Sequence, residues 1–155
     1  MKITLASDHA GYSLKQHLVN YLKEQGHNVL DLGVNSPYVS ADYPDAAEAV
    51  GQAVLDGRAE RGIILCGSGI GVSIAANKIS GIYAAICHDI YSAHQGVEHD
   101  RMNVICMGAH VIGQSLAEEI ATTFINAQVD DEERYARRFH KVQAIEKRKP
   151  KSHGE

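Results

Sequence analysis

The 155-residue sequence has no surplus of positive charge, no long apolar run and no pair of closely spaced cysteines. A formal net charge of -4 argues against a broad electrostatic surface for nucleic acid or for a membrane. No apolar stretch approaches the roughly 20 residues that a membrane-spanning helix needs. The N-terminal segment has a charged residue at position 2 and polar residues from Ser7, which is not typical of a signal peptide. We therefore expect a globular protein that binds neither nucleic acid nor a membrane.

The cysteines are too few and too widely spaced for a structural framework. Three are present, and without a CxxC pair they predict neither a disulfide network nor a zinc site. His94 and His99 do not form an HExxH motif, so their spacing does not indicate a metal site. We expect Cys87 and Cys106, each inside an apolar run, to be buried structural residues of a protein in the reducing cytoplasm.

Short apolar runs alternate with longer amphipathic segments along the chain. Strands are expected at residues 2–7, 28–33, 61–67, 82–89 and 103–109, and helices at 13–26, 45–57, between the later strands and after the last one. Strands that are apolar throughout are typical of parallel sheets covered on both faces. The order predicts one three-layer α/β/α domain, Rossmann-like, with a mainly parallel five-stranded sheet. We assign residues 1–146 to this domain and residues 147–155 to a charged C-terminal tail.

Open α/β sheets bind ligands outside the carboxyl ends of their strands. The most distinctive segment expected there is "CGSGIG", residues 66–71. It differs from the dinucleotide fingerprint because Val72 occupies the place of the last glycine, and it lacks the GK[ST] ending of a P-loop. Its backbone N–H groups, at the start of a predicted helix, are suited to bind an anion. The alternative is a tight turn without a ligand.

Cys66 stands at the start of this loop. A thiol beside a helix N-terminus ionises more readily, and its thiolate can act as a nucleophile or a general base. We expect the loop to make its surroundings polar and open, and a buried structural thiol is the alternative. At the same edge, Asp8 and His9 follow the first strand. His9 is suited to bind an anion or move protons, and Asp8 to bind sugar hydroxyls unless it caps the next helix.

Two arginines stand four residues apart near the C-terminus, in "DEERYARRFHKV". Arg134 and Arg138 therefore share one face of a predicted helix. Guanidinium groups at this spacing can hold a phosphate between them. The alternative is a solvated face on which the arginines pair with the acidic residues at 130–133, and His94 is likewise expected at a solvated helix end.

These segments together resemble the type B ribose-5-phosphate isomerases and the galactose-6-phosphate isomerase subunits. The resemblance extends from "SDHAG" at Ser7 to "RRFHKV" at Val142, and it is most specific in "CGSGIGVSIAANKISGIYAAICHDIYSA", Glu98-His99 and "NVICMGAHVIG". It implies an aldose–ketose isomerase without a metal or other cofactor, which converts ribose 5-phosphate to ribulose 5-phosphate through an enediolate. It also implies a homodimer, in some members a dimer of dimers, whose active sites are shared between subunits.

The family pattern implies catalytic roles for several matching residues. Cys66 would be the base that moves a proton between C1 and C2, and His99 would help to open the sugar ring. The developing enediolate oxygen would be held by the hydroxyl of Ser68 and by the loop backbone at Gly67, Gly69, Ile70 and Gly71. One such N–H donor is typically worth about 3 kcal/mol in a transition state.

Other matching residues would bind the substrate. His9, Arg134 and Arg138 would hold the phosphate. Asp8 would lie near the ring oxygens, and Tyr43 matches a substrate-pocket position. The phosphate takes no part in bond making, but its binding energy positions the reacting carbons. An arginine pair supplied by a partner subunit would explain why a chain of this length works as a dimer.

The sequence departs from the family pattern at three positions. Asp100 replaces a frequent asparagine, His110 replaces a frequent arginine, and Tyr83 stands where arginine is frequent. Asp100 and His110 remain predicted substrate-binding positions, and Arg101 is near enough in sequence to compensate. These changes affect the expected substrate and leave the chemistry intact. Allose 6-phosphate and galactose 6-phosphate are therefore alternative substrates, and a non-catalytic module that binds sugar phosphates or nucleotides is a distant alternative.

Overall fold

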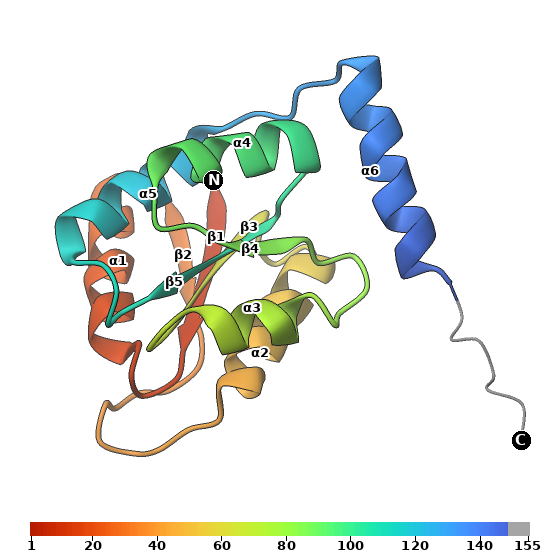
Figure 1. Cartoon of the computed structure of the whole chain (residues 1–155). Coiled ribbons are helices and arrows are strands. Elements are labelled where there is room, and N and C mark those ends of the chain that lie inside the picture. Colours follow the sequence, from red (N-terminus) through yellow and green to blue (C-terminus); the bar gives the residue numbers. More distant parts are fainter. Residues whose placement is uncertain (149–155) are drawn as a thin grey trace, which may run out of the picture.

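Five parallel strands form the sheet at the centre of the structure (Figure 1). The computed structural model describes residues 1–148. The elements are β1 (Lys2–Ser7), α1 (Tyr12–Glu24), β2 (Asn28–Asp31), α2 (Tyr43–Leu55), β3 (Arg61–Cys66), α3 (Ile70–Ala76), β4 (Ala84–Ile86), α4 (Ile90–Asp100), β5 (Val104–Gly108), α5 (Gln114–Asn126) and α6 (Glu133–Glu146). The strands are ordered β2-β1-β3-β5-β4, and every neighbouring pair is parallel. The predicted α/β class and five-stranded parallel sheet are confirmed.

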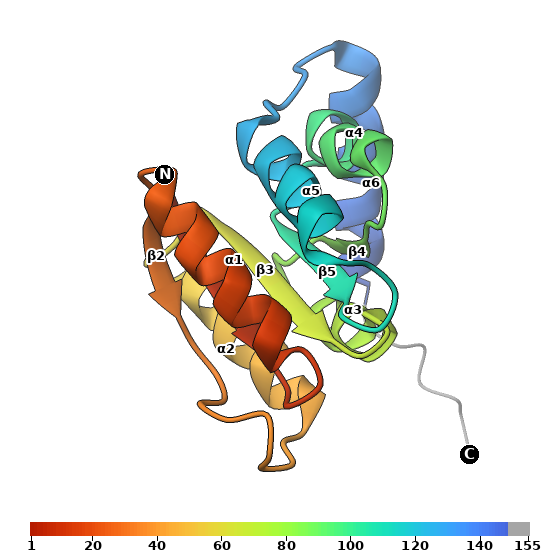
Figure 2. The same cartoon turned by 90° about the vertical axis from the view of Figure 1, so that its left-hand side faces the viewer.

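Helices cover both faces of the sheet (Figure 2). On one face, α1, α4 and α5 pack around Leu5, Ile63 and Met107. On the other face, α2 and α3 pack around Ile64 and Val104. Successive side chains of a strand point to opposite faces, so Ile63 and Ile64 belong to different layers. This double burial explains why β3 has no alternation of apolar and polar residues.

The centre of the sheet contains a topological switch point. The chain passes from β1 outward to β2, and from β3 it continues on the opposite side to β4 and β5. Ser7, the last residue of β1, is paired with Leu65, the residue before the end of β3. A crevice at the carboxyl ends of such strands is the usual ligand site of open α/β folds. Cys66 ends β3 at this point.

The last helix, α6, packs against α4 beside the β4 edge of the sheet (Figure 1). The Tyr83 ring meets the Phe139 ring edge-on, with centroids 4.8 Å apart. Glu146 accepts hydrogen bonds from the Gly81 N–H at 2.7 Å and the Tyr83 hydroxyl at 2.9 Å. The expected tail begins after Glu146, and its residues 149–155 lie outside the described part of the chain. No helix within residues 1–148 is long and apolar enough to cross a membrane.

Candidate active site

The thiol of Cys66 lies beneath the glycine loop that joins β3 to α3. Its Sγ accepts a hydrogen bond from the Gly69 N–H at 3.0 Å. This donor stabilises negative charge on the sulfur. The side chain is only 5% exposed, because the loop folds back over it. The expectation of open surroundings is therefore wrong for the single chain, whereas the expected polar contact with the loop is present.

Two glycines allow the loop to lie directly on the end of β5. Gly69 precedes α3 with a φ of 82°, in the left-handed region that side chains with a Cβ rarely adopt. A Cβ at Gly108 would lie 2.6 Å from both the carbonyl carbon and the oxygen of Ser68. The close approach of these two backbones places the Gly69 N–H where it reaches the Cys66 sulfur.

Two ring side chains border the loop. A Cβ at Gly71 would lie 2.8 Å from the Tyr43 ring, and a Cβ at Gly67 would lie 2.9 Å from the His110 ring. Each ring therefore lies against a glycine. Between them, Ser68 is exposed, and its Oγ accepts a hydrogen bond from the backbone N–H of residue 70 at 3.2 Å. The structure thus brings Tyr43, Ser68 and His110 together at the loop that covers the thiol.

Asp8 and His9 follow β1 at the same edge, where the Asp8 N–H donates to the Leu65 carbonyl. Asp8 is buried, and its Oδ1 accepts from the Gly11 N–H at 3.0 Å in the turn before α1. The N-cap of α1 is Gly11 and the helix has no side-chain cap, so the alternative that Asp8 caps this helix is wrong. His9 Nδ1 accepts from the Ala41 N–H at 3.1 Å. In the neutral ring the proton is then on Nε2, which can donate to an anion. We call Asp8, His9, Tyr43, residues 66–71 and His110 the carboxyl-edge group.

The other predicted residues form a second cluster around Tyr135 on α6. The His99 ring stacks on the Tyr135 ring, with a centroid distance of 3.9 Å and an angle of 9°. The guanidinium carbons of Arg134 and Arg138 lie 4.6 and 6.0 Å from the same ring centroid. Arg134 also pairs with Glu132 at 2.8 Å, as the alternative of a solvated charged face predicts. We call His99, Asp100, Arg134, Tyr135 and Arg138 the Tyr135 group.

Within one chain, these two groups lie at opposite edges of the sheet. The 11 residues of α4 run back from the carboxyl edge to Asp100, a distance of about 16 Å. β5 then begins at Val104, paired with Gly62 near the start of β3. His99 is therefore at the amino edge, whereas Cys66 is at the carboxyl edge. Figure 1 shows α6 across the molecule from the loop between β3 and α3.

Arg101 and Tyr83 also face α6. The Arg101 guanidinium carbon lies 5.1 Å from the Phe139 ring centroid, and one of its nitrogens is 3.6 Å from Asp131. Arg101 therefore belongs with the α4–α6 contact and does not replace an arginine beside His110. The pKa of Tyr83 is raised, chiefly by burial against α6.

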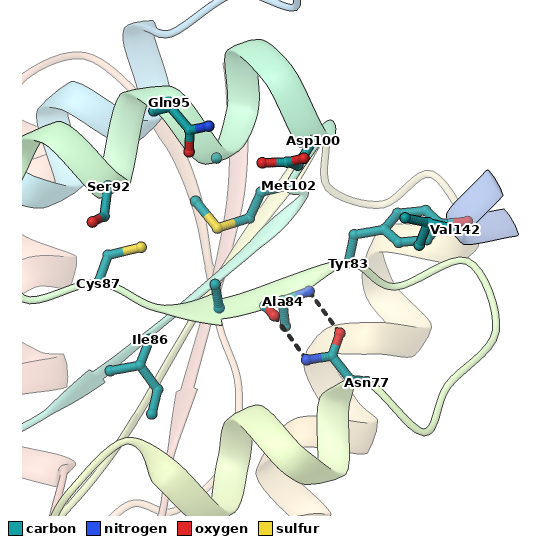
Figure 3. A pocket seen from close by; sticks show the side chains of 12 residues that line it. Asn77, Tyr83, Ala84, Ile86, Cys87, Ser92, Gln95, Asp100, Met102 and Val142 are labelled. Atoms are coloured by element: carbon teal, nitrogen blue, oxygen red, sulfur yellow. Dashed lines mark hydrogen bonds between the residues drawn. The ribbon is translucent and has the colours of Figure 1, made fainter. Parts of the chain in front are cut away.

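A cavity of about 470 Å³ lies beside β4 (Figure 3). Of the predicted site residues, Asp100 lines it, and none of the carboxyl-edge group does, so we do not assign it to the substrate. The Asn77 amide pairs with both backbone groups of Ala84, at 2.7 and 2.9 Å, along this edge. Burial raises the pKa of Cys87 on the cavity wall to about 11, and raises that of Cys106 further. Within residues 1–148, no three His, Cys, Asp or Glu side chains are placed to hold a metal ion.

His88 lies near the end of the strand expected at residues 82–89, and no role is predicted for it from the sequence. In the structure, His88 Nε2 accepts a hydrogen bond from the Gly108 N–H at 2.8 Å. Gly108 is the residue whose backbone packs closely against the Ser68 carbonyl group. The position of His88 directly after β4 is the signal that could have identified it.

The fold and the cysteine–glycine loop are those of an α/β enzyme, and the comparisons with known proteins narrow this class. The chain belongs to the ribose/galactose isomerase family, whose model matches residues 3–142. It is 40% identical over 148 residues to ribose-5-phosphate isomerase B of Escherichia coli, covering 96% of this chain and 98% of the relative. It is also 40% identical over 130 residues to D-erythrulose-4-phosphate isomerase of Pectobacterium atrosepticum, covering 84% and 86%. The solved structure of Clostridium thermocellum ribose-5-phosphate isomerase B matches with a TM-score of 0.91 and 43% identity, covering 95% of this chain and 98% of that one.

Proposed function

We propose that the chain is a cofactor-independent aldose–ketose isomerase that converts ribose 5-phosphate to ribulose 5-phosphate. The observation that supports this most directly is the hydrogen bond from the Gly69 N–H to Cys66 Sγ at the carboxyl edge of the sheet. This bond places the thiol that would act as the base next to a backbone N–H donor, at the usual ligand site of the fold. Relatives named ribose-5-phosphate isomerase B match nearly the whole chain.

The Cys66 thiolate would remove the proton from C2 of the open-chain aldose. The electron pair of that C–H bond forms the C1–C2 double bond, and the carbonyl electrons move onto O1 to give the enediolate. The hydroxyl proton of O2 then passes to O1, an O2 lone pair forms the ketone C=O bond, and the electron pair of the C1–C2 double bond takes the proton back from the thiol at C1. Ser68 and the loop N–H groups lie beside the sulfur, where they stabilise the charge on the enediolate oxygens.

The phosphate and the sugar ring require the Tyr135 group of a second copy. In one chain, His9 presents Nε2 at the carboxyl edge, whereas Arg134 and Arg138 are at the other edge. An isologous dimer places each group opposite its complement and completes two sites at once. His99 of the second chain would then open the ring and its arginines would hold the phosphate. The proposal therefore includes a homodimer, alone or within a dimer of dimers, with shared sites.

A tetrose phosphate is the second candidate substrate. A relative named for D-erythrulose 4-phosphate is as similar to this chain, at 40% identity, as one named for ribose 5-phosphate. In the structure the uncommon His110 lies against Gly67, at the mouth of the loop. This residue borders the proposed substrate site, so its replacement of the frequent arginine is the difference on which we base the second candidate.

The test is a substrate panel of ribose 5-phosphate, D-erythrulose 4-phosphate, allose 6-phosphate and galactose 6-phosphate. We expect ribose 5-phosphate to have the highest kcat/KM by about tenfold, a difference of about 1.4 kcal/mol. A higher kcat/KM for a tetrose or hexose phosphate would change the proposed substrate but not the proposed proton-transfer chemistry. Tight nucleotide binding without turnover of any sugar phosphate would instead indicate a non-catalytic module.

Variants of Cys66 test the base. Cys66→Ala should abolish turnover, and Cys66→Ser should preserve the fold with an oxygen that is a far weaker base near neutral pH. Full activity of Cys66→Ala would remove the thiol from the mechanism. A reducing cytoplasmic location belongs to the same proposal, because the three cysteines are free and the base must remain a thiol.

A further inference from the structure

We infer that His88 is a positioning residue for the glycine loop. Its imidazole acts as a hydrogen-bond acceptor beneath the loop and does not touch the substrate. The inference rests on the proposed function in one respect, namely that this loop holds the enediolate. His88 follows β4, whereas the loop follows β3. Because β5 lies between these two strands in the sheet, His88 can act on the loop through the end of β5.

β4 is too short to provide a backbone acceptor for the Gly108 N–H, the last backbone donor of β5. The two strands pair from Ala84 with Val104 to Ile86 with Cys106, and the Cys87 N–H still donates to the Cys106 carbonyl. Gly108 extends beyond the last of these pairs while it remains paired with Cys66 on the β3 side. Its N–H donates to His88 Nε2 at 2.8 Å. The imidazole therefore takes the place of a strand carbonyl.

This hydrogen bond supports the catalytic loop directly. A Cβ at Gly108 would lie 2.6 Å from the Ser68 carbonyl carbon, and a Cβ at Gly69 would lie 3.2 Å from the Gly108 nitrogen. The Gly108 backbone therefore lies under the Ser68–Gly69 peptide, whose N–H reaches Cys66 Sγ. Gly108 is buried, so loss of its acceptor would leave a donor without a partner. The backbone would then shift to find another acceptor, and the loop would move with it.

The contact requires a neutral imidazole. An accepting Nε2 has no proton, so the proton is on Nδ1, and an imidazolium would present a donor to the Gly108 N–H. The ionisable neighbours on this side are Asp89, which follows His88 in the chain, and His94 on α4. The Asp89 carboxylate already accepts the Ser92 N–H at 2.6 Å. A substitution at position 88 leaves all of these groups unchanged, and the contribution of His88 is thereby isolated.

Two variants separate hydrogen-bond acceptance from simple packing. His88→Asn keeps an acceptor oxygen that does not titrate, and His88→Leu keeps bulk without an acceptor. We expect His88→Leu to lower kcat by about tenfold or more while KM changes by less than about threefold. His88→Asn should retain kcat within about threefold. As a control, His27→Leu at the amino edge of β2 should leave both constants unchanged.

Rescue by the acceptor variant gives a readout that a packing role would not produce. Asparagine fills less of the histidine volume than leucine does, but only asparagine offers an oxygen to the Gly108 N–H. Wild-type kcat in His88→Leu, or an equal loss of kcat in both variants, would overturn the inference. If His88→Leu fails to fold by circular dichroism, a kcat of His88→Asn more than about tenfold below wild type would overturn it.

A measurement without turnover distinguishes this inference from the proposed function. Alkylation of Cys66 by iodoacetamide, followed by mass spectrometry, reports both how far the loop covers the sulfur and how well it stabilises the thiolate. The rate should differ from wild type by about threefold or more in His88→Leu, because the loop has moved, and stay near wild type in His88→Asn. If the chain isomerises no sugar phosphate, the proposed function fails and the alkylation rates still test His88. Equal rates in all three proteins would contradict its positioning role.

Discussion

Two inactive variants of this chain should restore activity when they are mixed. One is Cys66→Ala, which removes the proposed base and leaves the Tyr135 group intact. The other replaces both Arg134 and Arg138 by alanine, which removes the proposed phosphate contacts and leaves the carboxyl-edge group intact. Both arginines are exposed, so their loss should not affect folding. Loss of two charge-assisted phosphate contacts, each worth about 1.5–3 kcal/mol, should lower kcat/KM by at least about a hundredfold.

The expected recovery follows from the separation of the two groups in one chain. Random exchange of equal amounts makes half of the dimers mixed. In a mixed dimer, one site combines Cys66 with both arginines, and the other site lacks all three. One active site in two, in half of the dimers, gives about a quarter of wild-type activity at the same total concentration. If each chain contained a complete site, mixing would give no gain.

The assay is turnover of ribose 5-phosphate after the two proteins are unfolded together and refolded. Native mass spectrometry measures the fraction of mixed dimers, because the variants differ in mass. As the matched control, Cys66→Ala mixed with Cys66→Ser should recover nothing, since both lack the same group. Mixed dimers that form in the expected proportion without any gain in activity would refute the shared site.

Three further predictions concern the support of the glycine loop, a buried lysine and a buried thiol. Gly108→Ala, whose Cβ would lie 2.6 Å from a loop carbonyl, should lower kcat by about tenfold or more, whereas Gly113→Ala, which meets no atom within 4 Å, should not alter steady-state kinetics. Lys15→Met should lower the free energy of unfolding in urea by about 2–4 kcal/mol, because the 1%-exposed ammonium contacts Asp31 at 2.7 Å; a loss below about 1 kcal/mol would contradict this. Cys87, whose pKa burial raises to about 11, should be alkylated at about pH 8 only after unfolding. Because its folded pKa is raised, the stabilisation by its neutral form is present below the unfolded pKa of about 8.5 and is lost as the pH rises through 11.

The order of elements could be predicted from the sequence because double burial leaves a local signal. The central strand "RGIILC" is apolar throughout, and the structure places it with helices on both faces. Strand ends were less predictable. β4 was expected at residues 82–89 and comprises Ala84–Ile86. Its boundary depends on the Asn77 amide and on the His88 ring, which replace strand partners through contacts that no hydrophobic period records.

The candidate site was predictable to a similar degree. The glycine loop is continuous in sequence, so its composition alone indicated a candidate anion site, with a tight turn without a ligand as the alternative. The burial of Cys66 was missed because it depends on how the loop rests on β5, a contact between distant segments. The spacing of Arg134 and Arg138 indicated a shared helix face. It did not indicate that the Tyr135 ring contacts both guanidinium groups and stacks on His99, since aromatic stacking has no sequence period.

The α4–α6 contact gives the departure at Tyr83 a physical role. α6 is fixed near its start by the stacking of Tyr135 on His99. Near its end, Glu146 accepts hydrogen bonds from the Gly81 N–H and the Tyr83 hydroxyl. Burial, and then the contact with Glu146, raise the pKa of Tyr83, while the bonds from Gly81 and from Tyr83 lower that of Glu146. A helix held at both ends by its own chain is already ordered in the single chain, so association in the proposed dimer would not bear the entropy of ordering it. Tyr83 would therefore support the proposed phosphate contacts from a distance, and a change of substrate is better sought at His110, whose ring lies against Gly67 of the loop.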